Sequence, residues 1–145
     1  MTGPLQRRAI ADGVRFSRIH DPKFYHHSLS VTIITPLAEG KTSAAVLAAY
    51  LLRMGSRRCR DMTELECRLA DLYGAVLDTD ISRHGENQLL TFSIAGADDR
   101  FALEGESISR GCAELLGEIL LEPKVEGDAF PEEAFRLEQQ YLIDT

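Results

Sequence analysis

The residue types best suited to chemistry in this 145-residue chain are a pair of aspartates and four histidines. Asp78 and Asp80 are two residues apart in a strand-like segment, so both carboxylates are expected on one face of the strand. Such a pair could act in acid/base catalysis or bind a divalent cation, although two charges on a solvated strand face are the more common arrangement. His26 and His27 are adjacent, so on a strand they would point to opposite faces and could not share a metal ion. No histidine has a partner at metal-ligand spacing, and these residues alone predict no metal centre.

Composition excludes several classes of function. The chain has 16 Lys and Arg against 23 Asp and Glu, and the resulting net charge of −7 is opposite in sign to that of a nucleic-acid-binding surface. Its longest apolar run is well short of the roughly 20 residues that cross a bilayer, and the N-terminus lacks the apolar core of a signal peptide. We therefore expect a cytoplasmic protein that binds neither nucleic acid nor membrane. Cys59, Cys67 and Cys112 form no C-x-x-C pair and are expected to be reduced thiols.

The elements that must position these residues begin with two strands and a helix. Residues 14–19 and 29–33 show partial alternation of apolar side chains and are expected to form neighbouring, paired strands. A helix is expected from an N-cap at Thr42 to Met54. Residues 44–52 contain no charge, so this helix is expected to be buried on most sides.

A capped helix and a hairpin follow. Asp61 and Glu64 have the spacing of a capping box, which predicts a helix with apolar residues along one side that ends before Gly74. Residues 75–83 and 88–95 predict two antiparallel strands, because the turn between them has the composition of a hairpin loop.

Two more helices complete the predicted order. An apolar stripe predicts a helix over residues 105–121, and Pro131 suits the first turn of a last helix. The order is therefore ββααββαα, which favours an α+β fold with an antiparallel sheet and helices packed on one face.

This succession resembles the N-terminal part of the pitrilysin/insulinase zinc metallopeptidase superfamily. In that superfamily an inverted His-x-x-Glu-His helix leads into a Gly-Thr or Gly-Ser turn, and a later strand starts with Asn-Ala. Here Gly55-Ser56 follows the apolar helix, and Asp78-Thr79 occupies the place of Asn-Ala. Aligning the turn places Val46, Ala49 and Tyr50 where the family has its first His, its Glu and its second His.

The third zinc ligand of the family is also replaced. It is a Glu that follows a Phe-x-x-Glu pattern, which Phe135 and Glu138 match, and the ligand position then falls on Thr145. Valine and alanine cannot bind zinc or transfer a proton, and a phenol is at best a poor ligand. The resemblance thus implies a non-catalytic homologue without zinc or another cofactor, with the half-domain fold of the mitochondrial processing peptidase. Within the superfamily the chain is most similar to bacterial inactive partners linked to elongation factor P modification.

The resemblance also implies partners and a binding surface. Such a protein would form part of a peptide-binding chamber with an active, zinc-bearing homologue or with itself. Because the family holds a peptide as an added strand, Asp78, Thr79 and Asp80 are the expected substrate-binding positions. Two other functions stay open: an active zinc metalloendopeptidase with ligands elsewhere, and a plain α+β protein-interaction module. Residues 1–145 are expected to be the N-terminal part of one peptidase-like domain in a longer chain.

Overall fold

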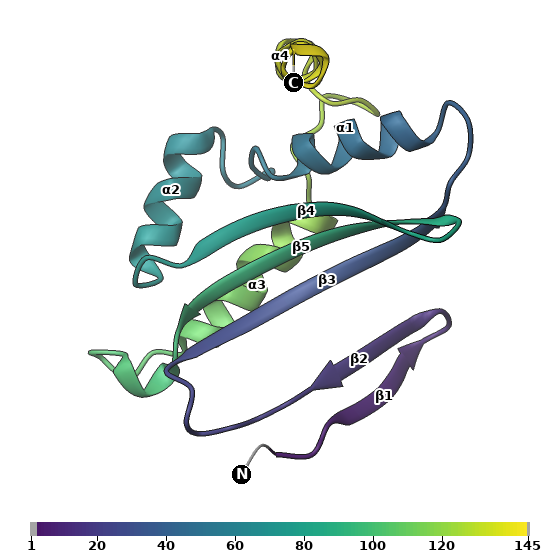
Figure 1. Ribbon diagram of the computed structural model, residues 1–145. Coiled ribbons are helices and arrows are strands. Elements are labelled where there is room, and N and C mark those ends of the chain that lie inside the picture. The colour runs from purple at the N-terminus through teal and green to yellow at the C-terminus, as the bar shows by residue number, and fades with distance from the viewer. Residues whose placement is uncertain (1–2, 145) are drawn as a thin grey trace.

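The computed structural model describes residues 3–144 and has an α+β architecture (Figure 1). The elements follow in the order β1 (Gln6–Ala11), β2 (Val14–Arg18), β3 (His26–Pro36), α1 (Thr42–Leu52), α2 (Met62–Asp71), β4 (Val76–His84), β5 (Asn87–Ala97), a 3-10 turn (Asp99–Phe101), α3 (Ile108–Leu121) and α4 (Glu132–Asp144). The predicted α+β class and antiparallel strand pairing are confirmed.

The strands form two separate sheets rather than the single sheet that was predicted. β1 and β2 make a two-stranded hairpin, and the other three strands pair in the order β3-β5-β4. The expected pairing of residues 14–19 with 29–33 is therefore wrong, and the strand Gln6–Ala11 was not predicted. The reason is local: the Asp12-Gly13 turn, in which Gly13 has a φ of +71°, lets β2 pair with the segment just before it.

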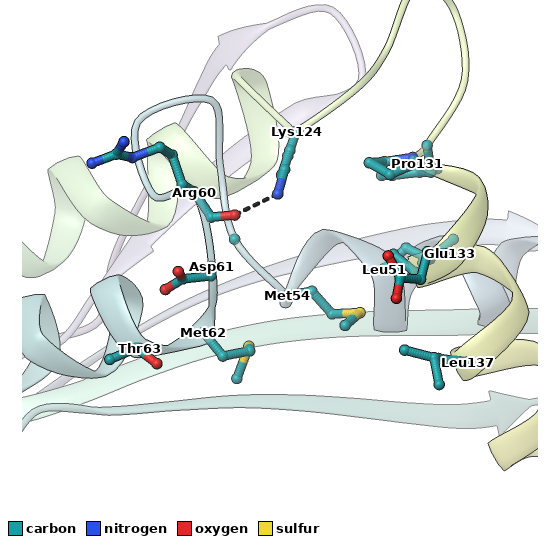
Figure 2. A pocket seen from close by; sticks show the side chains of 13 residues that line it. Leu51, Met54, Arg60, Asp61, Met62, Thr63, Lys124, Pro131, Glu133 and Leu137 are labelled. Carbon is teal, nitrogen blue, oxygen red and sulfur yellow. Dashed lines mark hydrogen bonds between the residues drawn. The ribbon is translucent and has the colours of Figure 1, made fainter.

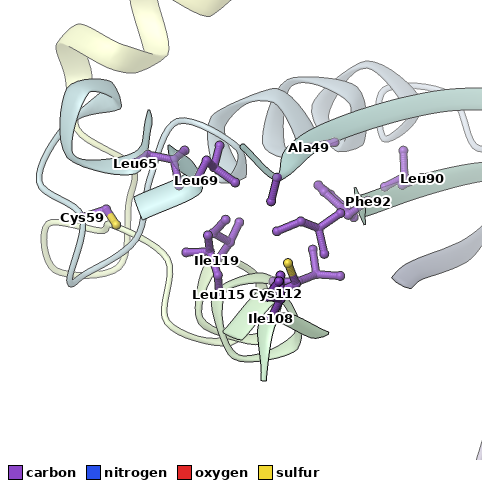
Figure 3. Close-up of a cluster of buried hydrophobic side chains, with 13 residues drawn as sticks. Ala49, Cys59, Leu65, Leu69, Leu90, Phe92, Ile108, Cys112, Leu115 and Ile119 are labelled. Atoms are coloured by element: carbon purple, nitrogen blue, oxygen red, sulfur yellow. The ribbon is translucent and has the colours of Figure 1, made fainter. Parts of the chain in front are cut away.

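The core lies on one face of the three-stranded sheet. Alternate residues of the central strand, Leu90, Phe92 and Ile94, are buried against the helices. The cluster also contains Ala49 of α1, Leu65 and Leu69 of α2, an apolar stripe of α3, and Cys59 and Ala75 from the segments that flank α2 (Figure 3). The stripe consists of Ile108, Cys112, Leu115, Leu116 and Ile119. Every second residue of β5 and one stripe along α3 are therefore buried, as expected when a helix packs on one face of a sheet.

The apolar helix α1 is less buried than its composition predicted. Only Ala49 and Leu51 are buried, because α4 covers just part of the side of α1 that faces away from the sheet (Figure 1). Its boundaries also differ from the prediction. The N-cap is Lys41 rather than Thr42, and the helix ends at Leu52, two residues before the expected end.

The predicted cap of α2 is confirmed. The Asp61 side chain accepts a hydrogen bond of 2.9 Å from the Glu64 backbone N–H, which satisfies one of the free donors at the helix start. The Glu64 carboxylate does not return to Asp61 as in a full capping box, since it accepts instead from the Arg60 backbone N–H at 2.7 Å. α3 begins at Ile108, later than the expected residue 105, because Ser107 supplies its cap.

A buried polar network fixes the turn after α1 to two other helices. The Ser56 hydroxyl donates to Glu118 of α3 and accepts from the backbone N–H groups of Arg58 and Cys59, both at 3.1 Å. Arg68 of α2 donates to the same carboxylate at 2.8 Å. Burial by itself would raise the pKa of Glu118, but the hydrogen bonds from Arg68 and Ser56 outweigh it and hold this pKa below its ordinary value. Glu118 therefore stays ionised and ties α1, α2 and α3 together.

Candidate functional site

Val46, Ala49 and Tyr50, which were predicted from the sequence to replace the residues of a zinc helix, lie in a packed part of the fold. Ala49 is 1% exposed and belongs to the core, while Val46 and Tyr50 are half-buried. The Arg53 guanidinium lies over the Tyr50 ring, 5.6 Å from its centroid. Thr145, the fourth position, lies outside the described residues. Within residues 3–144 no group of three or more His, Cys, Asp or Glu side chains could hold a metal ion.

β4 lies beside α1 and forms one edge of the three-stranded sheet (Figure 1). The hydrogen-bonding direction of its backbone follows from the sheet register. Leu37 N–H bonds to Glu86 O at 2.8 Å and Asp98 N–H to Tyr25 O at 2.9 Å, and these bonds extend the β3–β5 ladder at both ends. In both bonds the residue on the β5 side, Glu86 or Asp98, has an even number. The backbone groups of successive residues in a central strand point alternately to its two neighbours, so even-numbered residues of β5 bond to β3 and odd-numbered ones bond to β4.

It follows that alternate backbone groups of β4 point away from the sheet. Asp78 and Asp80 lie opposite Ser93 and Thr91 and bond to β5, so the N–H and C=O groups of Leu77, Thr79 and Ile81 face outward. Among residues 3–144 no backbone group from another segment pairs with this outer edge. The edge thus offers unpaired donors and acceptors to an added strand.

The side chains of the three predicted substrate-binding residues point to different faces. Asp78 and Asp80 share one face of the strand, as the sequence predicted, and this is the face away from the helices, while Thr79 lies on the helix side opposite Phe92. The Asp78 carboxylate accepts from the Thr79 backbone N–H at 2.9 Å. Neither aspartate forms an ion pair within residues 3–144. The Thr79 hydroxyl is buried and has no hydrogen-bond partner in the described part of the chain.

The middle of the open face of the sheet carries small hydroxyl side chains. Thr32, Thr91 and Asp80 lie side by side across β3, β5 and β4. The next such row consists of Ser30, Ser93 and Asp78. The Thr32 and Thr91 hydroxyls are hydrogen-bonded at 3.0 Å. No Lys or Arg occurs at the positions of β3, β4 and β5 that face this side, so the aspartates give it a negative edge.

A groove lies on the other side of α1, between the end of α1, the start of α2 and the N-terminal half of α4 (Figure 2). Its volume is about 420 Å³, and its apolar lining includes Leu51, Met54, Met62, Phe130 and Leu137. Lys124 closes one end by donating from Nζ to the Arg60 carbonyl, as the dashed line in Figure 2 shows. Sequence patterns gave no indication of this groove, because its walls come from four separate segments.

The histidines do not form a site. His26 and His27 start β3 and point to opposite faces, as predicted. His27 Nδ1 lies 2.9 Å from the Ala97 carbonyl oxygen, while its buried Nε2 has no partner within residues 3–144. The ring packs over Gly96 next to Cys112, whose thiol pKa is raised by burial. The sequence did not predict this packing, because it depends on the register between β3 and β5.

Comparisons with known proteins add a sequence relative and a solved structure. No family model matches the chain. Over 120 residues, which are 83% of this chain, it is 25% identical to "Probable inactive metalloprotease YmfF" of Bacillus subtilis (strain 168). The fold matches the crystal structure of a conserved protein from Enterococcus faecalis V583 with a TM-score of 0.90 at 24% identity, over 95% of this chain.

These matches cover only part of the longer proteins. The chain spans 28% of the length of the curated relative and 32% of the solved chain. Across residues 3–144, no helix is both long and apolar enough to pass through a membrane. The chain is therefore similar in sequence to a protein named as a probable inactive metalloprotease, and it shares its fold with part of a larger solved protein.

Proposed function

We propose that this chain is part of a non-catalytic, peptidase-like protein that binds peptides without cleaving them. The observation that carries the proposal is that the unpaired edge of β4 lies beside α1. We take α1 to be the counterpart of the zinc helix of the pitrilysin/insulinase type, with Val46 and Tyr50 in place of the two His ligands and Ala49 in place of the Glu that activates the water. An open strand edge can hold an extended peptide through backbone hydrogen bonds alone, so binding does not need the lost side chains. The name of the Bacillus relative is in accord with such a loss of activity.

The proposal includes a partner. A protein that binds a peptide but lacks a metal needs another subunit if the peptide is to be hydrolysed. We expect that subunit to be a zinc-bearing homologue with an intact His-x-x-Glu-His helix, and the two proteins to enclose the peptide in one chamber built from half-domains of the mitochondrial processing peptidase type. The hydrolysis would then occur at the zinc of the partner, whose bound water is activated by the metal.

The test uses the full-length protein, alone and mixed with such a homologue. Hydrolysis of a set of quenched fluorogenic peptides should be absent for this protein alone and present, with altered rate or selectivity, for the mixture. Zinc analysis of untagged protein should give well below one tightly bound ion per chain, because Val46, Ala49 and Tyr50 provide no imidazole or carboxylate. Chelator-sensitive hydrolysis by this protein alone would show that the proposal is wrong.

A further inference from the structure

We infer that the β4 edge selects peptides that carry basic side chains at alternate positions, opposite Asp78 and Asp80. This inference rests on the proposed function, since it specifies the class of peptide that the same edge would hold. It concerns only the side chains of this chain and the geometry of its outer strand.

The outward backbone groups of β4 determine how an added peptide would pair with this strand. Because Leu77, Thr79 and Ile81 point their N–H and C=O groups outward, an antiparallel peptide would form its hydrogen-bonded pairs with these three residues. Asp78 and Asp80 would then lie in the non-hydrogen-bonded pairs of the new ladder. In such pairs the facing Cα atoms are only about 4.5 Å apart, and the side chains are in closest contact.

The charges of the open face determine which peptide side chains fit. Both carboxylates are exposed, neither is in an ion pair, and no Lys or Arg lies on this face of the described sheet. Directly opposite charges stabilise a cross-strand pair, and like charges destabilise it. A lysine or arginine opposite each aspartate is therefore favoured, and a glutamate there is disfavoured.

The Asp78 carboxylate has a second role in the unliganded edge. It accepts a hydrogen bond from the outward N–H of Thr79 at 2.9 Å. A peptide carbonyl that pairs with Thr79 would replace this bond, which frees the carboxylate to meet a cation. The peptide residue between the two basic ones and the residue on either side of them would lie on the helix side, next to Leu77, Thr79 and Ile81, where small apolar side chains fit the partly buried surface.

The experiment measures binding of three fluorescein-labelled peptides to the full-length protein by anisotropy. The probe has the sequence Ser-Val-Lys-Val-Lys-Val-Ser, and the matched peptides carry Gln or Glu in place of both lysines. Two cross-strand ion pairs predict that the Lys peptide binds about 2- to 30-fold more tightly than the Gln peptide, and that the Glu peptide binds more weakly than either. The preference should shrink at high ionic strength, because exposed charges are screened.

Two variants separate the charge inference from the proposed edge. D78N/D80N should abolish the preference for lysine, while the control D12N/D128N, which removes two exposed aspartates elsewhere, should keep it. Thr79→Pro removes an outward N–H without breaking the β4–β5 ladder and should weaken all three peptides. Equal affinities for the three peptides, all weakened by Thr79→Pro, would overturn the charge inference and leave the proposed function intact.

The remaining outcomes are also decisive. A lysine preference that D12N/D128N removes as fully as D78N/D80N would mean that net charge, not these two residues, attracts the peptide, and it would overturn the inference. Absence of binding for every peptide would count against the edge itself, and therefore against the peptide-binding part of the proposed function.

Discussion

Replacing Glu118 with glutamine should lower the free energy of unfolding by about 1–3 kcal/mol. The Glu118 side chain is 6% exposed and accepts from Arg68 at 2.8 Å as well as from Ser56. Removing one partner of a fully buried ion pair costs about 3–5 kcal/mol. Arg68 is 38% exposed, so water can hydrate its charge after the change, and Ser56 can still donate to the new amide oxygen. Both effects place the expected loss below the value for a fully buried pair.

The pH dependence gives a second, independent check of the same residue. The pKa of Glu118 is lowered from its ordinary value of 4.5, because the hydrogen bonds from Arg68 and Ser56 outweigh the effect of burial. A lowered carboxyl pKa stabilises the folded state above the ordinary pKa, and this stability is lost as the pH falls through the folded-state value. The difference between wild type and Glu118→Gln should therefore be constant near neutral pH and decrease below about pH 4.5.

Urea unfolding followed by circular dichroism at several pH values measures both effects. Glu114→Gln is the matched control, because Glu114 lies on the same helix and pairs with Arg110 at 3.1 Å while 66% of its side chain is exposed. Exposed pairs of this kind contribute about 0.5 kcal/mol or less. If the two variants lost the same stability, or if the loss in Glu118→Gln did not change with pH, the network would not hold the helices together as described.

Three further changes test the core, a close contact and a helix cap. Leu51→Asp would place an unpaired charge at a side chain that is 5% exposed and should cost several kcal/mol, so thermal unfolding close to that of wild type would contradict its place in the core. Gly96→Val should cost about 1–3 kcal/mol, because a Cβ there would lie 3.0 Å from His27 Cε1 and 3.3 Å from Cys112 Sγ; an unchanged unfolding midpoint would show that these side chains can move aside. Asp61→Ala should cost about 1 kcal/mol in chemical unfolding, with Asp61→Asn as the conservative control that keeps most of the cap, and equal losses in both would argue against a capping role.

Elements with strong local determinants were predicted from the sequence. The α2 cap at Asp61 depends on residues three apart. The β4–β5 hairpin depends on Gly85, whose φ of +62° suits the first central position of a type II′ turn. The segment Gln6–Ala11 has no regular apolar alternation, so its strand could be found only through the turn at Asp12-Gly13 that joins it to β2.

The candidate site could be predicted only in part, for a physical reason. The period of a strand was enough to place Asp78 and Asp80 on one face. Which face that is, and the position of β4 at an edge, follow from the order β3-β5-β4, which is set by contacts between segments far apart in the chain. The Ser56–Glu118 contact spans 62 residues and leaves no pattern in the sequence near either residue.

The packing around α1 bears on the proposal that Val46, Ala49 and Tyr50 stand in place of the His, Glu and His of a zinc-peptidase helix. Ala49 is 1% exposed and belongs to the same apolar cluster as Phe92 and Leu90. A glutamate at this position would carry its carboxylate into that cluster, where an unpaired charge costs several kcal/mol unless it is protonated or bound to a cation. A zinc ion could supply that compensation only if His side chains at positions 46 and 50 were present at the same time. In the absence of a metal, alanine at position 49 is therefore expected to be more stable than glutamate.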